Sequence, residues 1–476
     1  MTAATVARMS AEQTRRQLAE TRKACQETIS RCENAEDTTK QTLAEIRSVL
    51  NRWDAAKAKF GRALDNAARR IASAMQEQAI AEPTGPPCGP TAHGFDAPQG
   101  LADPKKVVDC ELVARPKMQT GIAAHEFRDT DEALHVKVKF LADMLMRAKH
   151  ACVYTGAGIS TAAGIADYAS RAGARSSVLT KPEDSLDGNP FSAGSALHAA
   201  PTYTHKALTA LHRRGMLEGG WVQQNHDALP QKAGFPQEAI NEIHGAWMDP
   251  SNPVVPMDGS LRKDLVGKLD HTIKHADLVI AMGTSLSGVS ADRVVSSIGK
   301  RREEQRSPKH LPGIVETDEG DQEEVKEEPT LLGAVIINVQ QTRLDAVASL
   351  RIFAPVDEVM RMLASMLSVR VPSDVPTPKT PHEDAWTALP YTADGERDRG
   401  LKTTLRLHPG AKVKIVRGNA PMVPDGLKGT VCPKKTPQGH YNIYFEDGVF
   451  RALGVWMMHA AQEGKLEMLP IVNVTE

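Results

Sequence analysis

The stretch that decides the fold is Ala151–Thr161, which reads ACVYTGAGIST. A short apolar run, Ala151–Thr155, is followed there by a turn that contains Gly156 and Gly158. Glycine permits a tight turn, and N–H groups at the start of a following helix would face a pyrophosphate. The sixth position of the dehydrogenase fingerprint is Thr161 instead of glycine, so a hydride-transfer enzyme is disfavoured. Taken alone, the stretch also fits an ordinary turn between a strand and a helix.

Two further apolar runs follow, at Leu278–Met282 and Ala334–Val339. Stretches with helical character alternate with them, at Leu134–Lys149, Pro201–Arg214 and Asp292–Arg302. Buried apolar strands that alternate with helices are typical of a parallel α/β sheet. We therefore expect an α/β, Rossmann-like domain over residues 131–370.

Two other units are predicted outside this range. Residues 1–80 carry apolar residues at heptad spacing, which predicts a long helical or coiled-coil segment. Its function would be a homodimer contact, and an intramolecular hairpin or a helix lying on the next domain is the alternative. Several short strands in 404–476 predict a small SH3-like β-barrel, for which a peptide or nucleic-acid role stays open.

Three stretches are expected to lack regular structure. Residues 81–130 and 371–403 begin with runs rich in proline and are interpreted as linkers. Residues 302–330 are basic and then strongly acidic, which indicates a solvated insertion within the α/β domain.

The composition excludes several classes of protein. A net charge of -1 over 476 residues gives no global attraction to nucleic acid or to anionic membranes. The six cysteines form no Cys-x-x-Cys pair, so neither a disulfide framework nor a thiolate zinc site is expected. Neither a membrane-spanning apolar stretch nor a signal peptide is recognised, and an intracellular protein is the expectation.

Five segments resemble, in the right order, motifs of the sirtuin family: VYTGAGISTAAGIADYAS from Val153, VQQNHDAL from Val222, EIHG from Glu242, GTSL from Gly283 and VIINV from Val335. The sequence of these motifs most resembles that of the nuclear, chromatin-associated branch of the family. This resemblance implies a nuclear location, with the cytoplasm as the alternative. The resemblance implies an NAD-dependent protein-lysine deacylase. Such an enzyme transfers an acyl group from lysine to ADP-ribose and releases nicotinamide.

The resemblance also implies roles for individual residues. His244 would be the catalytic base, while Asn225 and Asp227 would bind the nicotinamide amide and a water molecule. For Asn225 and Asp227, an Asx turn is the alternative. The NAD-binding residues would further include Gly156, Ala157, Gly158, Asp167, Tyr168, Gln224, Gly283, Thr284, Ser285 and Asn338.

The chain departs from the family pattern in three places. Ala166 and Ala169 replace the proline and the arginine of the first motif, and Arg171 and Arg175 are out of register to substitute. Residues 246–276 contain no cysteine, so the zinc ribbon of the family is absent and no metal is expected. His226 adds an ionisable group beside the predicted nicotinamide pocket. These departures leave open a weak or inactive NAD- or ADP-ribose-binding scaffold, and also ADP-ribosyl transfer to protein.

Overall fold

The structure is a computed structural model that describes residues 85–111, 122–165, 199–256, 259–306, 331–374, 379–418, 422–436 and 439–474. The described residues all belong to one compact unit, Ile80–Glu476. The coiled coil predicted for 1–80, most of the acidic insertion, and the predicted site residues Asp167 and Tyr168 lie outside these ranges.

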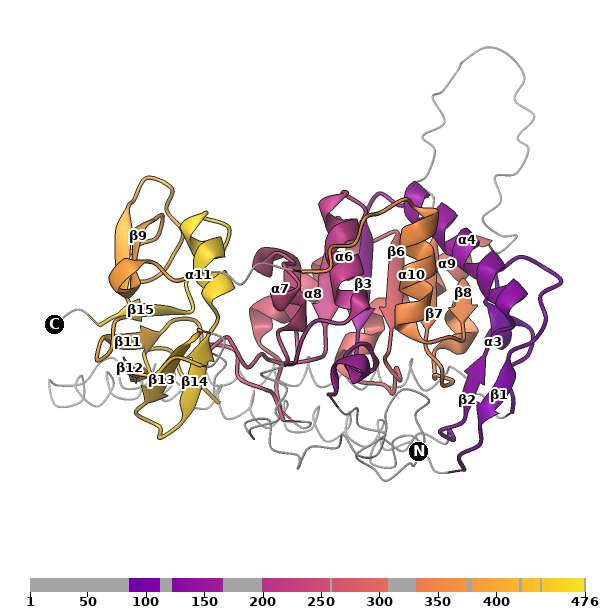
Figure 1. Ribbon diagram of the computed structural model, residues 1–476, viewed down its shortest axis with the longest axis horizontal. Helices are drawn as coiled ribbons and strands as arrows, with labels where there is room; N and C mark the ends of the chain where they lie inside the picture. The colour runs from indigo at the N-terminus through magenta and orange to yellow at the C-terminus, as the bar shows by residue number, and fades with distance from the viewer. Residues whose placement is uncertain are drawn as a thin grey trace, which may run out of the picture. The chain divides into compact units, whose positions relative to one another are not determined.

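The centre of the fold is a six-stranded parallel sheet with the order β5-β4-β3-β6-β7-β8 (Figure 1). Its strands are β3 (Ala151–Thr155), β4 (Trp221–Gln223), β5 (Ile240–Glu242), β6 (Leu278–Met282), β7 (Gly333–Ile337) and β8 (Leu350–Ile352). The chain runs outward from β3 in one direction and then from β6 in the other. This is the strand order of dinucleotide-binding α/β folds, with the reversal between β3 and β6. The Rossmann-like prediction is confirmed.

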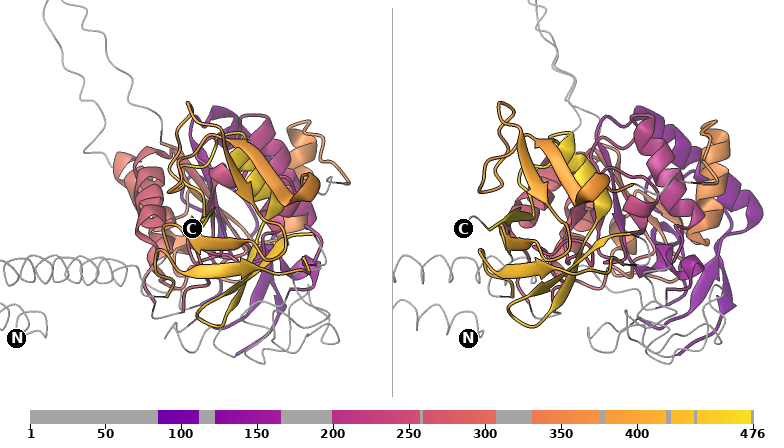
Figure 2. Two further views of the ribbon diagram at one scale, coloured as in Figure 1. Left: turned by 90° about the vertical axis from the view of Figure 1, so that its left-hand side faces the viewer. Right: turned by 60° about the vertical axis from the view of Figure 1, so that its left-hand side comes forward.

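Alternate residues of each central strand enter two separate cores. In β3, Val153 packs into one core and Tyr154 into the other. Helices α4 (Asp131–Arg147), α6 (Tyr203–Arg213) and α10 (Val356–Met366) contribute to the first core, and α8 (Lys263–His275) and α9 (Arg293–Arg306) to the second. Helices therefore cover both faces of the sheet, as Figures 1 and 2 show, which explains why its longer strands are continuous apolar runs.

Short elements complete the α/β part. They are 3₁₀ turns η2 (Ala157–Ile159), η3 (Thr161–Ala163), η6 (Gln237–Ala239), η7 (Ser290–Asp292) and η9 (Asp345–Val347), and helix α7 (Leu229–Lys232).

Regular structure occupies part of the stretch predicted as a linker over 81–130. It holds helix α3 (Pro90–His93) and strands β1 (Lys105–Val108) and β2 (Glu126–Arg128), which pair antiparallel. Gly94 follows α3 with φ +90°, and a Cβ there would lie 2.5 Å from Leu350 Cα. The missing side chain lets the backbone of 94–96 bind that of Ala348 and Ser349. Gly94 therefore permits close packing of two backbone segments and does not indicate a flexible linker.

The C-terminal part is a five-stranded antiparallel sheet, ordered β14-β13-β12-β11-β15, with a separate two-stranded sheet β10-β9. The strands are β9 (Ala385–Leu389), β10 (Thr403–Arg406), β11 (Lys412–Ile415), β12 (Lys428–Val431), β13 (Tyr441–Phe445), β14 (Phe450–Leu453) and β15 (Ile471–Asn473), with η10 (His382–Asp384) and helix α11 (Val455–Gln462).

The small β-barrel prediction is confirmed only in part. The strands over 412–453 lie where the sequence places them, but among the described strands no pairing closes the sheet into a barrel. The predicted linker 371–403 also contains part of this fold, since Trp386, Leu389 and Tyr391 are buried in its core. In the sequence these three residues stand among polar ones, so no apolar run indicates that they belong to a core.

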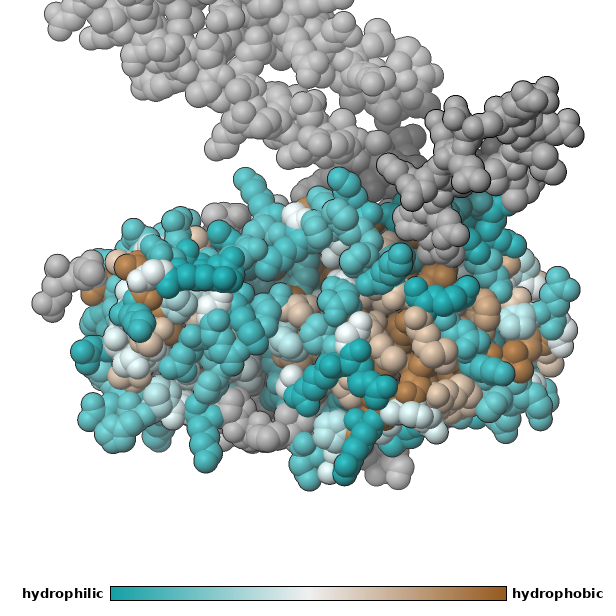
Figure 3. All heavy atoms as spheres, turned by 90° about the horizontal axis from the view of Figure 1, so that it is seen from above, coloured by the Kyte–Doolittle hydropathy of each residue, from teal (hydrophilic) through white to brown (hydrophobic). Residues whose placement is uncertain are grey.

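Most residues on the face in Figure 3 are hydrophilic, with one area where apolar residues gather. In the part of the chain that the structure describes, no helix is long and apolar enough to cross a membrane.

A buried ion pair joins α4 to the segment before it. Lys137 Nζ lies 2.6 Å from Asp129 Oδ1 and donates to Ala92 O at 3.0 Å, and both charged side chains are fully buried. Burial lowers the pKa of Lys137 to about 8. The pair therefore ties α3, β2 and α4 together where no water can replace a lost partner.

We expect Lys137→Met to destabilise the protein by about 3–5 kcal/mol, because it leaves the Asp129 carboxylate buried without its cation. Urea unfolding followed by circular dichroism measures this loss. Lys139→Met, on the exposed side of the same helix, is the control and should change stability by less than about 0.5 kcal/mol. Equal losses for both variants would contradict the account.

Candidate functional site

The carboxyl ends of the six parallel strands form one row. Pairing places Glu242 beside Gln223, Gln223 beside Thr155, Thr155 beside Met282, Met282 beside Ile337, and Ile337 beside Ile352. The segments that follow the strands therefore emerge at the same edge of the sheet. The described site residues predicted from the sequence all follow this row: Gly156, Ala157, Gly158, Gln224, Asn225, Asp227, His244, Gly283, Thr284, Ser285 and Asn338.

At the switch point, the turn after β3 lies directly against the turn after β6. Gly156 N donates to Met282 O at 3.1 Å and Gly158 N donates to Gly283 O at 2.8 Å. A Cβ on Gly158 would lie 2.7 Å from Gly283 Cα, and Gly283 itself has φ +57°. These glycines are thus required by contact between two backbones of the protein.

The helix expected directly behind the glycine turn is not found in the described residues. Turns η2 and η3 follow, and Gly164 ends η3 in the left-handed conformation with φ +80°. Backbone donors for an anion are nevertheless present at this edge. Among the described residues, the N–H groups of Ala157, Thr284 and Ser285 donate to no protein acceptor. Such groups suit the phosphates of a dinucleotide.

Asn225 and Asp227 are held by Ser160, a residue of the first motif that was not predicted as a site residue. Asn225 Nδ2 donates to Ser160 Oγ and to Gly156 O, each at 3.0 Å. Ser160 Oγ in turn donates to Asp227 Oδ2 at 2.7 Å. The Asx turn considered as the alternative is present at Asp227, whose Oδ1 accepts from Leu229 N at 3.0 Å. Among the described residues, Asn225 Oδ1 accepts no hydrogen bond, so its carbonyl is available to a ligand amide.

Gln224 connects the segment after β4 to the segment after β6. Its Oε1 accepts from Thr284 Oγ1 at 3.3 Å, and its Nε2 donates to Asp292 Oδ1 at 3.3 Å and to Tyr154 OH. Tyr154 OH also donates to Asp292 Oδ1 at 2.8 Å. Asp292 carries no motif that would have identified it from the sequence.

His244 is half-buried and lies two residues after the end of β5. The neighbouring loops are joined by His226, whose Nδ1 lies 2.9 Å from Gly245 O. Because a carbonyl oxygen can only accept, the proton of this His226 contact is on Nδ1. Gly245 has φ +96°, and a Cβ there would lie 2.2 Å from Pro253 O. The glycine after His244 is therefore required by the segment that folds back over it.

The cysteine-free segment after His244 is compact. His244 O accepts from Val255 N at 2.9 Å, and Ala246 N donates to Asn252 O at 2.8 Å. Asn252 Nδ2 donates to Glu242 O at 3.0 Å. The C-terminal part contributes as well, since Gly454 N donates to Met248 O at 2.9 Å. These contacts within the protein hold the segment 246–256.

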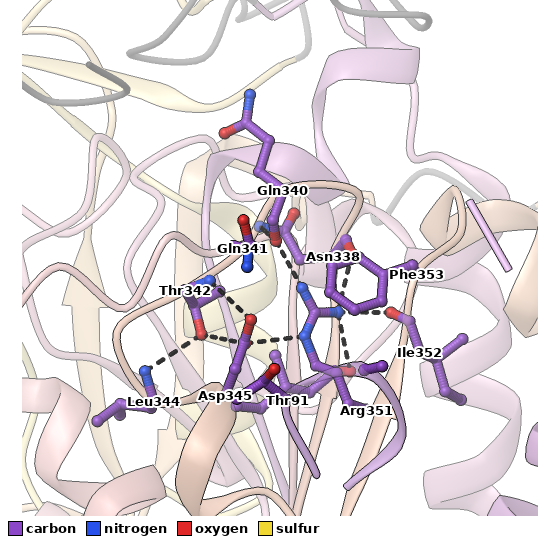
Figure 4. Close-up of polar contacts among 12 residues, drawn as sticks. Thr91, Asn338, Gln340, Gln341, Thr342, Leu344, Asp345, Arg351, Ile352 and Phe353 are labelled. Carbon is purple, nitrogen blue, oxygen red and sulfur yellow. Dashed lines mark hydrogen bonds and ion pairs between the residues drawn. The ribbon is translucent and has the colours of Figure 1, made fainter. Parts of the chain in front are cut away.

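The loop after β7 is shaped by a buried arginine, shown in Figure 4. Arg351 Nε donates to Asp345 Oδ1 at 2.8 Å, and its terminal nitrogens donate to Asn338 O at 2.9 Å and Gln340 O at 2.5 Å. The guanidinium also lies 3.5 Å from the ring centre of Phe353. Five donors in a fixed plane can bind several carbonyls at once, so Arg351 sets the path of the backbone that carries Asn338.

One cluster of potential metal ligands lies outside this edge. Ligand atoms of Asp109, Glu111 and His125 lie within 4.8 Å of one another. However, Lys106 Nζ already binds Asp109 at 2.8 Å, and His125 Nδ1 accepts from Cys110 N at 3.0 Å. We assign no metal to these residues.

Glu242 is a buried acid at the end of β5. Burial raises the pKa of Glu242 to about 7. Its Oε2 accepts from Gln237 Nε2 at 3.1 Å, while Oε1 has no hydrogen-bond partner among the described residues. Glu242 also lines a cavity of about 210 Å³, together with Met457 and Leu469 of the C-terminal part. The ionised form of Glu242 is therefore unfavourable in the folded protein, and this residue lies two positions before His244.

The strand order, the paired turns at the switch point and the free backbone donors define a Rossmann-like domain of the dinucleotide-binding class. No family model matches the chain. Among curated proteins, it is 29% identical over 316 residues to NAD-dependent protein deacetylase sirtuin-7 of Rattus norvegicus, covering 57% of this chain and 70% of that protein. It is 27% identical over 364 residues to the Bos taurus sirtuin-7, covering 71% and 86%.

A shorter match is 38% identical over 125 residues to NAD-dependent protein deacetylase SRT1 of Oryza sativa subsp. indica, covering 26% of this chain and 25% of that protein. Among solved structures, a Sir2 enzyme is 21% identical, with a TM-score of 0.36 over 49% of this chain and 98% of that chain. The relatives' sequences and the motifs of the chain together support a divergent member of the sirtuin family.

We expect Gly158→Ala to destabilise the protein by about 1–3 kcal/mol, because the added methyl group would overlap the Gly283 backbone. Gly267→Ala is the matched control: a Cβ at this position in α8 meets no atom within 4 Å, and alanine favours the helix by up to about 1 kcal/mol. Thermal unfolding compares the two. Unchanged stability in Gly158→Ala would rule out the tight contact.

The Glu242 pKa predicts a pH dependence with a definite sign. Because the folded-state pKa of about 7 exceeds the ordinary 4.5, this group lowers stability as pH rises from about 4.5 through 7. We expect Glu242→Gln to raise the free energy of unfolding by about 1–3 kcal/mol at pH 8. At pH 4 the variant and the wild type should agree. Glu218→Gln, an exposed acid, should show no such difference at either pH.

Proposed function

We propose that the protein is an NAD-dependent protein-lysine deacylase that transfers an acyl group from lysine to ADP-ribose and releases nicotinamide. The observation that supports this most is the row of strand ends. It brings the segments carrying His244, Asn225 and Asp227 to adjacent positions, beside the paired turns at the switch point. His244 follows β5, and the other two residues follow β4, its direct neighbour.

The residues present fit NAD as the cofactor. Free N–H groups of Ala157, Thr284 and Ser285 would bind its phosphates, and Asn338 would contact the adenosine ribose. Asn225 Oδ1 would accept from the nicotinamide amide, and Gln224 would support the ribose side. When bound, NAD supplies a breakable bond between nicotinamide and ribose, and the ribose as acyl acceptor.

The chain's own groups then provide acid–base chemistry and orientation. His244 would take the proton of a ribose hydroxyl, because a histidine side chain can act as a general base at neutral pH. Asp227 is buried and holds Ser160, which in turn holds Asn225. The glycine turns position these groups without contributing to proton transfer. Acylated lysines of proteins would be the substrates, and a nuclear location is proposed from the resemblance alone.

A non-catalytic scaffold that binds NAD or ADP-ribose is the second candidate. Ala169 favours it, because the family arginine at that position is absent. The missing cysteines in 246–276 favour it as well. The contacts within 246–256 support the first candidate, since they hold the His244 segment without a zinc ribbon.

The deciding assay measures nicotinamide release from NAD with an acetylated peptide and with its unmodified form. We expect acyl-dependent release in the wild type and a loss of about 100-fold or more in His244→Ala. Stabilisation of His244→Ala by ADP-ribose in a thermal shift assay should persist. His135→Ala, exposed on α4, is the matched control and should retain activity.

Two results would contradict the proposal. Stabilisation of the wild type by ADP-ribose without any acyl-dependent release would favour the scaffold. Covalent transfer of label from labelled NAD to protein would favour ADP-ribosyl transfer.

A further inference from the structure

The five-stranded C-terminal sheet has one face that the α/β fold does not use. Residues along its strands alternate: Val413, Ile415, Val431, Ile443 and Phe445 are buried in the core beneath. The residues between them on the opposite face are exposed or half-buried, and we call this set the outer face: Lys412, Lys414, Lys428, Thr430, Asn442, Tyr444, Phe450 and Ala452. At the β15 edge this side of the sheet is covered, since Val472, which pairs with Lys414, is 4% exposed and lies beside Gly395. The outer face on β11 to β14 is exposed or half-buried.

Strand register brings the outer face together as rows. Lys412 pairs with Thr430, Thr430 with Tyr444, and Tyr444 with Phe450. In the next row Lys414 pairs with Lys428. Neighbouring strands lie roughly 4.8 Å apart, so the distance from Phe450 to the β11 lysines is about 14 Å. Aromatic rings stand at one end of this surface and lysines at the other.

The aromatic end is exposed to an unusual degree. Tyr444 and Phe450 have 46% and 63% of their surface exposed, and Val449 beside them has 46%. The two rings contact each other with centroids 4.7 Å apart. Adjacent exposed rings of this kind form a stacking platform and mark a surface that binds something.

The basic end is only weakly neutralised. Lys412 Nζ donates to Thr430 Oγ1 at 2.8 Å, a neutral partner. Lys414 lies 3.8 Å from Asp394, whose side chain is 87% exposed, and Lys428 has no carboxylate within ion-pair distance among the described residues. Asp447 is paired with Arg451 at 2.7 Å. Glu446, whose backbone N donates to Lys428 O at 2.9 Å, is a further acid beside these lysines. The outer face therefore favours a negatively charged ligand.

We propose that the outer face binds single-stranded nucleic acid. Bases stack on exposed aromatic rings while lysines follow the phosphate backbone, and the outer face provides both features within a span of a few nucleotides. The three lysines disfavour a methylated lysine or a cationic peptide. An acidic peptide would use the lysines but would leave the two rings without a stacking partner.

Fluorescence anisotropy of the full chain with labelled oligothymidine and oligouridine tests this proposal, and the two arms distinguish DNA from RNA. We expect binding to one or both that weakens with salt. The double variant Tyr444→Ala/Phe450→Ala should weaken binding by about tenfold or more, since stacking contributes strongly per base. Lys412→Ala/Lys428→Ala should also weaken binding and lower the slope of log affinity against log salt by about 1–2.

Matched controls separate this effect from general charge or misfolding. Lys139→Ala/Lys149→Ala removes two exposed lysines from the α4 region and should leave binding within about twofold of the wild type. Glu446→Gln should strengthen binding. Thermal unfolding should be the same for all variants because the changed side chains are exposed or half-buried.

Three outcomes would overturn the proposal. The first is no binding to either oligonucleotide at low salt. The second is binding that Tyr444→Ala/Phe450→Ala leaves unchanged, as for a polyanion bound by charge alone, with heparin as the comparison probe. The third is tighter binding of an acidic peptide than of either oligonucleotide, lost in the same variants.

Discussion

The contact on which the site depends is the one between two backbones at the switch point of the sheet. Gly158 and Gly283 approach until no side chain fits between them. Gln224, in the segment after β4, passes close to Gly156 and reaches Thr284 and Asp292 across this contact. The glycines of the first motif therefore shape the site mainly by allowing two segments of the protein backbone to pack against each other.

The sequence predicted the parts of the fold that carry strong local signals. Strands β3 and β6 were predicted with their observed bounds, because each is an apolar run followed by glycine. Strands β4, β5 and β8 have only three residues each, too few for any periodicity to appear. Their positions depend on pairing with neighbours that are distant in the chain, which no local pattern records.

The site was predictable only where a motif carries it. Asn225, Asp227 and His244 came from resemblance and emerge at one edge, although their roles stay predictions. Asp292 and Arg351 carry no local signal, yet one binds Gln224 and Tyr154 and the other fixes the loop of Asn338. The linker interpretation of 81–130 failed in part because burial of Ala92 depends on its contact with Lys137, in a helix that follows later in the chain.

The order of the strands has a consequence for how the site comes into being during synthesis. β3 is made early, but its partner β6 is separated from it in the chain by β4, β5 and helices α6 and α8. Such contacts close long loops and form slowly. A nascent chain that ends before Leu278 has the glycine turn but lacks the backbone that packs against it. The proposed dinucleotide site can therefore form only after most of the α/β part has left the ribosome.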